Sequence, residues 1–148
     1  QLSLAEQYAA VELFRGTMVR HSVIAYRDDS PGSADRISFA GDAWLDYVPL
    51  RMPDTICVLE RLPPGAAAVL INPTHAYRDL IVPIDSAEKR LFDAMDGNRS
   101  IGGIVERTLP SSKSKPQLDM ARTFFEKLWR FDQVVFDASR YRARGEEA

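Results

Sequence analysis

Apolar residues recur along the chain with two different periods, and the change of period separates predicted helices from predicted strands. Residues 1–16 place apolar side chains at helical spacing, and Ser3 with Glu6 forms a capping-box pattern ahead of them. Between residues 18 and 84 the apolar runs become short and β-branched, and Pro, Gly, Asn and Asp separate them. Helical spacing returns over residues 86–130. The pattern therefore predicts a helix, then strands, then further helices.

The first predicted strands form a hairpin. Residues 18–28 and 36–40 are rich in β-formers, and the stretch between them is dense in turn residues. Residues 44–50 alternate only partly and contain Pro49, so we expect an edge strand or an irregular segment there.

A second group of predicted strands follows. Residues 54–61 are apolar on both faces for most of their length, which favours a central place in a sheet. Residues 66–72 and 79–84 form a further predicted pair, and Pro83 places the latter strand near an edge or at a strand end. The Pro-Pro-Gly run at 63–65 is the best candidate for a boundary within the chain.

The stretch 85–107 predicts two short helices joined by a sharp turn. Asp85 with Glu88 resembles a capping box at the start of the first helix. Gly97 suits a left-handed position at its end, and Ser100 is placed to cap the second helix.

Two glycines, Gly102 and Gly103, stand inside the second of these helices. Each weakens a helix by ~1 kcal/mol relative to Ala. No G-x-G-x-x-G pattern surrounds them, so we reject phosphate binding. The expected role of the pair is the close packing of two backbones.

The last part of the chain predicts a third helix and a closing strand. Residues 110–116 read as a flexible polar linker, the helix begins near Gln117, and residues 132–137 form the strand. The expected inner face of the helix consists of Leu118, Ala121, Phe125 and Leu128.

Composition and charge narrow the classes of function. Of 148 residues, 45% are hydrophobic and the formal net charge is -2, which argues against tight sequence-independent nucleic-acid binding. No run approaches the ~20 apolar residues of a membrane span, and no signal-peptide pattern opens the chain. We therefore expect a soluble, cytoplasmic protein without membrane contact. The start at Gln1 suggests a piece of a longer chain.

Residues with catalytic or metal-binding chemistry are sparse. The two histidines, His21 and His75, lie in different segments without metal-ligand spacing, and we expect His75 to be an exposed loop residue. The single cysteine, Cys57, lies in an apolar run and reads as a buried inert thiol. No G-x-S-x-G elbow is present. We therefore predict no catalytic residue, metal or cofactor, and leave enzymatic activity uncertain, with more weight against activity in this chain alone.

The run from Ala66 to Phe136 combines the later elements in an informative order. A strand pair, AAAVLINP and RDLIVPID, precedes a helix that ends in Asp96-Gly97. The next residues, NRSIGGIV, fit a D-G-x-x-[TS]-[IV]-x-x-[IVL] pattern, and the long helix and the strand QVVFD follow. In this combination the segment, about half of the chain, resembles the PqqD-like family of peptide-chaperone and RiPP-recognition domains.

The resemblance implies a fold and a division of the chain. The fold class is α+β, with an N-terminal β-rich segment followed by a winged helix-turn-helix. Residues 1–62 would form a helix and a β-rich segment of unrecognised type, residues 66–138 the PqqD-like winged helix, and residues 139–148 a polar tail.

The resemblance also implies a partner and its contacts. In that family a leader peptide adds as a strand to the sheet edge and leans on the third helix, with main-chain hydrogen bonds supplying affinity. Carried over by position, the peptide-binding residues are Leu80, Ile81 and Val82 on the strand and Arg122, Phe125 and Trp129 on the helix. In the plain structural reading, Phe125 and Trp129 are core residues, and residues 80–82 only pair with residues 66–72.

Three functions stay open at this point. The first is a peptide- or protein-binding module, free-standing or part of a larger biosynthetic enzyme. The second is an accessory or regulatory domain of an enzyme such as a methyltransferase. The third is a DNA-binding winged helix that uses Arg122, Lys127 and Arg130, although its predicted recognition helix carries little basic surface.

Overall fold

The chain divides into two units, Gln1–Arg36 and Ile37–Ala148. The computed structural model describes residues 3, 6, 7, 9–11, 37–75, 77, 79–109 and 114–138. In the first unit the predicted capping box is confirmed, because the Ser3 N–H donates to Glu6 Oε2 at 2.7 Å and the Glu6 N–H donates to Ser3 Oγ at 3.3 Å. The predicted strand 18–28, residues 110–113 of the predicted linker 110–116, and the tail 139–148 lie outside the described residues.

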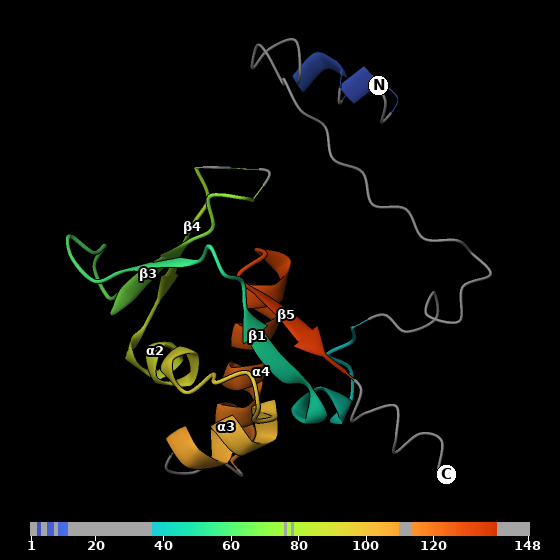
Figure 1. Cartoon of the computed structure of the whole chain (residues 1–148), viewed down its shortest axis with the longest axis vertical. Coiled ribbons are helices and arrows are strands. Elements are labelled where there is room, and N and C mark those ends of the chain that lie inside the picture. The colour runs from blue at the N-terminus through green and yellow to red at the C-terminus, as the bar shows by residue number, and fades with distance from the viewer. Residues whose placement is uncertain are drawn as a thin grey trace. The chain divides into compact units, whose positions relative to one another are not determined.

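The second unit is a mixed α+β structure with two small antiparallel sheets (Figure 1). One sheet has three strands in the order β2-β3-β4, which span Ile56–Val58, Ala68–Ile71 and Ile81–Ile84. The other is a two-stranded ribbon in which β1 (Val48–Arg51) pairs with β5 (Val134–Asp137). The ribbon joins the start of the unit to its end, because its two strands come from distant parts of the chain.

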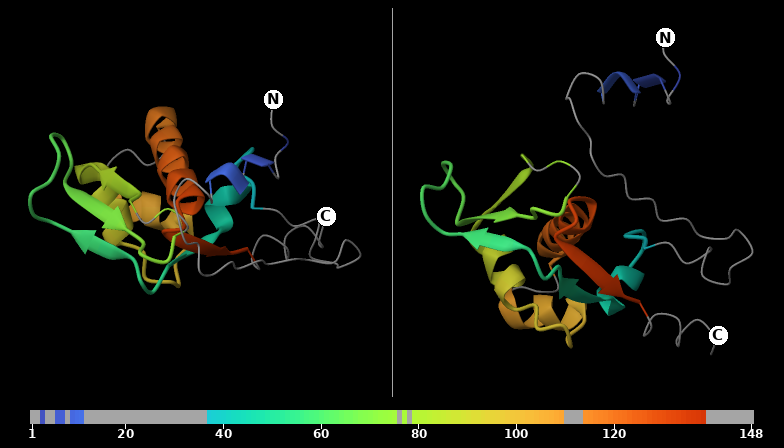
Figure 2. Two further views of the ribbon diagram at one scale, coloured as in Figure 1. Left: turned by 90° about the horizontal axis from the view of Figure 1, so that it is seen from above. Right: turned by 45° about the horizontal axis from the view of Figure 1, so that its top comes forward.

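The helices pack beside both sheets. They are the 3-10 helix η1 (Ala43–Asp46) and the α-helices α2 (Ser86–Asp93), α3 (Ile101–Thr108) and α4 (Lys115–Arg130). Figure 2 shows the three-stranded sheet (green) on one side of α4 and η1 (teal) on the other. These helices and both sheets contribute to one buried apolar cluster, whose α4 members are Ala121, Phe124, Phe125 and Leu128.

The two faces of the three-stranded sheet differ in exposure. The register aligns Ile56, Ile71 and Ile81 across the three strands, and we call this line the isoleucine row. At the two ends of this row, Ile56 is 52% exposed and Ile81 is 51% exposed. The neighbouring positions along the strands point to the opposite, core-facing side, where Leu70 and Val82 are buried. The outer face of the sheet therefore presents apolar side chains to solvent.

Several predicted strands differ from the structure. Residues 37–40 of the expected strand 36–40 form no strand. In that segment the Phe39 ring lies within 6.4 Å of the rings of Tyr47, Trp129 and Phe136, so its burial comes from aromatic packing instead of sheet pairing. Residues 44–50 split into η1 and the edge strand β1, which contains Pro49 as expected.

The expectation of a central strand at 54–61 is wrong, because the strand there is shorter and lies at an edge of the sheet. Only Ile56–Val58 pair, and β3 lies at the centre of the sheet. Because β2 pairs with β3, the Pro-Pro-Gly run at 63–65 is a connection inside one sheet, and the chain divides at residue 36 instead. The predicted pairing of 66–72 with 79–84 is confirmed.

Local signals set the ends of the short helices. Asp85 Oδ1 accepts from the Ala87 and Glu88 N–H groups, and Glu88 Oε2 accepts from the Asp85 N–H, which confirms the capping box. Ser100 Oγ accepts from the Gly103 N–H at 3.3 Å, as predicted. Gly97 is left-handed with φ 76, but α2 already ends at Asp93, so the glycine turns the loop between the helices.

The loop between α2 and α3 depends on one carboxylate. Asp96 Oδ1 accepts from the backbone N–H groups of Asn98 and Arg99 at 2.9 and 3.0 Å. These two hydrogen bonds, with a smaller contribution from the Arg99 charge, lower the pKa of Asp96 below its ordinary value. The ionised side chain therefore stabilises this turn.

Close packing explains one of the two helix glycines. A Cβ on Gly102 would lie 3.3 Å from the backbone oxygen of Leu45 in η1, whereas a Cβ on Gly103 would meet only Ser100 Oγ, at 3.7 Å. The predicted close approach of two backbones is therefore confirmed at Gly102.

The two glycines provide a matched pair of substitutions. Gly103→Ala should raise the free energy of unfolding by up to ~1 kcal/mol, because Ala has the higher helix propensity. Gly102→Ala gains the same propensity but must push against the Leu45 backbone, so it should be less stable than Gly103→Ala by about 1 kcal/mol. Urea denaturation measures both, and equal stabilities would contradict the proposed contact between α3 and η1.

Asp96 should make part of the stability dependent on acid pH. A carboxyl with a lowered folded-state pKa contributes stability above its unfolded pKa of ~3.9, and this contribution is lost as the pH falls through the folded pKa. Asp96→Asn removes the titration, so the difference in unfolding free energy between wild type and variant should shrink from neutral to acid pH. A difference that stays constant with pH would contradict this role.

Candidate functional site

Of the three predicted strand residues, Ile81 and Val82 lie in the edge strand β4, and Leu80 directly precedes it. β4 pairs with β3 on one side, and no strand of the described part of the chain pairs with its other side. Leu80 is half-buried, Ile81 is exposed on the outer face, and Val82 is buried in the core. The strand therefore offers one exposed side chain and a free backbone edge.

Backbone groups on the free edge can be assigned from two hydrogen bonds. In an antiparallel strand, both polar groups of one residue point to the same neighbour, and the direction alternates along the chain. The Ile84 carbonyl accepts from the Ala67 N–H, on the β3 side, and the Pro83 carbonyl accepts from Lys127 Nζ, on the other side. By this alternation Ile81 and Pro83 present their backbone groups outward, and Pro83 has no N–H to offer.

The predicted helix residues do not gather beside β4. Phe125 is fully buried in the core, with its ring 5.4 Å from that of Phe124, as the plain structural reading held. Trp129 is 39% exposed and lies 6.3 Å from the Phe39 ring. Arg122 lines a cavity together with residues of η1. Arg122 and Trp129 therefore lie on the flank of α4 that faces η1 and Phe39.

Lys127 is the α4 side chain that reaches β4. Its Nζ lies 2.6 Å from Glu88 Oε1 and 3.4 Å from the Pro83 carbonyl oxygen, and 5.6 Å from the centre of the Phe124 ring. From sequence, Lys127 is expected only as a contact to DNA. Lys127 and Glu88 are 39 positions apart, and no sequence signal connects them.

Glu88 connects two parts of this edge. Oε2 closes the capping box with the Asp85 N–H at 2.9 Å, while Oε1 binds Lys127. A carboxylate with both oxygens engaged holds its side chain in one conformation. The end of β4, the start of α2 and the last turn of α4 are therefore tied together at one carboxylate.

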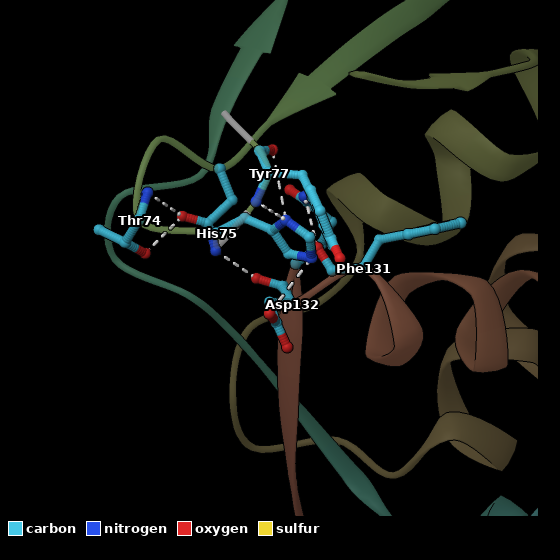
Figure 3. Close-up of polar contacts among 7 residues, drawn as sticks. Thr74, His75, Tyr77, Phe131 and Asp132 are labelled. Atoms are coloured by element: carbon cyan, nitrogen blue, oxygen red, sulfur yellow. Dashed lines mark hydrogen bonds and ion pairs between the residues drawn. The ribbon is translucent and has the colours of Figure 1, made fainter. Parts of the chain in front are cut away.

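A second polar cluster fixes the other end of β4. Asn72 is 1% exposed, and its Nδ2 donates to the Asp132 carbonyl oxygen at 2.5 Å. Asn72 Oδ1 accepts from the N–H and the hydroxyl of Thr74. These bonds join the loop between β3 and β4 to the turn after α4 (Figure 3).

His75 belongs to the same cluster. Its Nδ1 accepts from the Tyr77 N–H at 2.9 Å, so the ring proton belongs on Nε2, which lies 3.5 Å from Asp132 Oδ2 (Figure 3). The His75 side chain is only 10% exposed, so the expectation of an exposed loop histidine is wrong. Its contacts hold the loop in place.

Asp132 forms the turn after α4 that contacts the loop between β3 and β4. It has a left-handed backbone with φ 51, and its N–H and that of Gln133 donate to the carbonyls of Trp129 and Leu128. This hydrogen-bond pattern is that of a Schellman motif, in which Gly is the usual left-handed residue. Aspartate at this position adds a side chain that contacts His75.

The described residues contain no group of three His, Cys, Asp or Glu side chains that could hold a metal ion. Cys57 is half-buried in β2 and packs against the core. His21 lies outside the described residues. Within the described part of the chain, no helix is both long and apolar enough to span a bilayer.

Comparison with models of protein families and with curated protein sequences found no significant match to the chain.

The buried amide of Asn72 should matter for stability. Asn72→Ala leaves the Asp132 carbonyl and the Thr74 N–H without their partner, so the free energy of unfolding should fall by about 1–3 kcal/mol. Asn98→Ala, at an exposed asparagine, is the control and should cost less than about 0.5 kcal/mol. Thermal and urea denaturation measure both. An Asn72→Ala protein as stable as the control would contradict the role assigned to this cluster.

Proposed function

We propose that the second unit is a peptide-binding winged-helix module of the PqqD-like kind, in which an extended peptide adds as a strand to the free edge of β4. The order of its elements supports this proposal, because three antiparallel strands precede three helices. The observation that carries it is the outer edge of β4, with which no strand of the described residues pairs. The partner is a peptide or a partner protein, met in the cytoplasm.

Main-chain hydrogen bonds would supply the affinity. Ile81 offers an outward N–H and an outward carbonyl, and Pro83 offers a carbonyl. An added strand would satisfy these groups without requiring any particular side chain. Strand addition therefore accounts for binding, and the side chains around the edge must account for selectivity.

Two features around the edge would select the peptide. On the outer face, a peptide residue opposite Ile81 would extend the isoleucine row by one position, which favours a β-branched or aromatic residue there. On the inner side, the next peptide residue points toward α4, where the Lys127 ammonium lies beside the Pro83 carbonyl. An acidic residue at that position would compete with Glu88 for Lys127.

Lys127 also disfavours unspecific strand pairing at the edge of β4. Its ammonium donates a hydrogen bond to the Pro83 carbonyl oxygen. A backbone N–H of an added strand would need the same acceptor. Lysine on an edge strand or beside it is a common means of preventing unwanted sheet extension. A binding peptide must therefore displace this hydrogen bond, and the energy for this must come from contacts that a random strand lacks.

The isoleucine row supplies the test of this function. Ile81 and Ile56 are the same residue type in the same row, are almost equally exposed, and lie on opposite edges of the sheet. A randomised library of twelve-residue peptides on phage provides the ligand, and the best binder is synthesised. Ile81→Lys should weaken its binding at least about tenfold, whereas Ile56→Lys should change it less than about twofold.

The backbone provides a second measurement on the same peptide. Binding should protect the Ile81 amide from hydrogen exchange, because that N–H points outward in the free protein. The Val82 amide points toward β3 and should change little. Equal losses from Ile81→Lys and Ile56→Lys, or unchanged exchange at Ile81, would show that the peptide does not add to β4.

A further inference from the structure

A cavity of about 310 Å³ lies between η1 and the first turns of α4. Its volume is at the lower end of the range of small-molecule and side-chain pockets in proteins. It lies on the flank of α4 that carries Arg122, whereas Lys127 and β4 lie on the other flank. The cavity is therefore separate from the proposed peptide edge.

The apolar part of the cavity is preformed. Trp44 contributes to it while being only 3% exposed, and its ring lies 6.3 Å from Phe39. The backbone of Leu45 packs closely against Gly102 of α3, which fixes the position of Leu45. Leu118 forms the apolar part of the α4 side. An apolar ligand group would thus enter a space whose walls are already packed.

The charged part of the cavity has unused donors. Among the described residues, Arg122 Nη2 makes one ion-pair contact, 3.5 Å from Asp119 Oδ1, and both side chains are about half-exposed. A guanidinium has five N–H donors, so the ion pair seen among the described residues uses only part of its capacity. Lys115, a second cation at the cavity, forms no ion pair with any described residue.

The carboxylate of Asp42, on the η1 side of the cavity, orients a ligand. Asp42 lies at the start of η1, and its side chain makes no capping hydrogen bond there. Its carboxylate repels a ligand anion from the η1 wall, whereas the carboxylate of Asp119, which lines the α4 wall, is already paired with Arg122 at 3.5 Å. A ligand carboxylate would therefore face α4, where Lys115 and Arg122 lie, while the apolar group meets Trp44 and Leu118.

We infer that this cavity binds an apolar side chain with a carboxylate directly beside it, the chemistry shared by an N-acylated apolar amino acid and the carboxyl-terminal residue of a peptide. The apolar group occupies the space between Trp44 and Leu118, and the carboxylate accepts hydrogen bonds from Arg122. A bidentate arrangement suits the planar guanidinium.

Nuclear magnetic resonance of the whole chain tests the inference. The chain has two tryptophans, so its two indole N–H signals are assigned with Trp129→Phe, and the Trp44 signal reports on the cavity. The probes are N-acetyl-L-leucine, its uncharged amide, and an acetylated tripeptide that ends in leucine. The two carboxylates should shift the Trp44 signal saturably, and the amide should bind about tenfold more weakly.

Matched arginine variants identify the binding group. Arg122→Gln should remove the preference for the carboxylate over the amide. Arg130→Gln, on the same helix with a 2.8 Å ion pair to Glu126, should retain it. Tighter binding of the tripeptide than of N-acetyl-leucine indicates a peptide end as the source, and the reverse indicates a free acylated amino acid; both support the site. An unmoved Trp44 signal, equal binding of acid and amide, or equal effects of the two variants would overturn it.

Discussion

The burial of α4 is the constraint on which the rest of the second unit depends. Four of its side chains, among them Phe124 and Phe125, are fully buried, and they contact the core formed by the sheet, η1, α2 and α3. A helix that buries one face leaves two flanks beside that face, and each flank meets a different neighbour. Lys127 meets β4 and α2 on one flank, and Arg122 meets η1 on the other. Both proposed sites are therefore consequences of how one helix is buried.

The edge of β4 is held at both ends by polar groups. At one end Glu88 joins Asp85 to Lys127, and at the other Asn72 joins the loop before β4 to the turn after α4. Each of these groups is hydrogen-bonded more than once, so its conformation is defined. An edge strand fixed in this way loses little conformational entropy when a peptide pairs with it, which favours strand addition.

Local features of the fold could be predicted because a few neighbouring residues determine them. The capping boxes at Ser3 and Asp85 and the cap at Ser100 depend on side chains within three positions of the groups that they bind. The left-handed Gly97 follows from the steric freedom of glycine. The pairing of 66–72 with 79–84 follows from two β-prone runs joined by a short loop.

Sequence alone determined that Ala121, Phe125 and Leu128 share the inner face of α4, that α2 and α3 begin at caps, and that the chain combines strands with helices. Only the tertiary structure decided that β3 and not β2 is central, that Phe39 packs among aromatic rings outside any strand, and that Lys127 instead of Arg122 and Trp129 adjoins β4. The physical reason is that periodicity reports the direction of a side chain relative to its own helix or strand. What that side chain meets depends on elements distant in sequence, such as the Glu88 that binds Lys127.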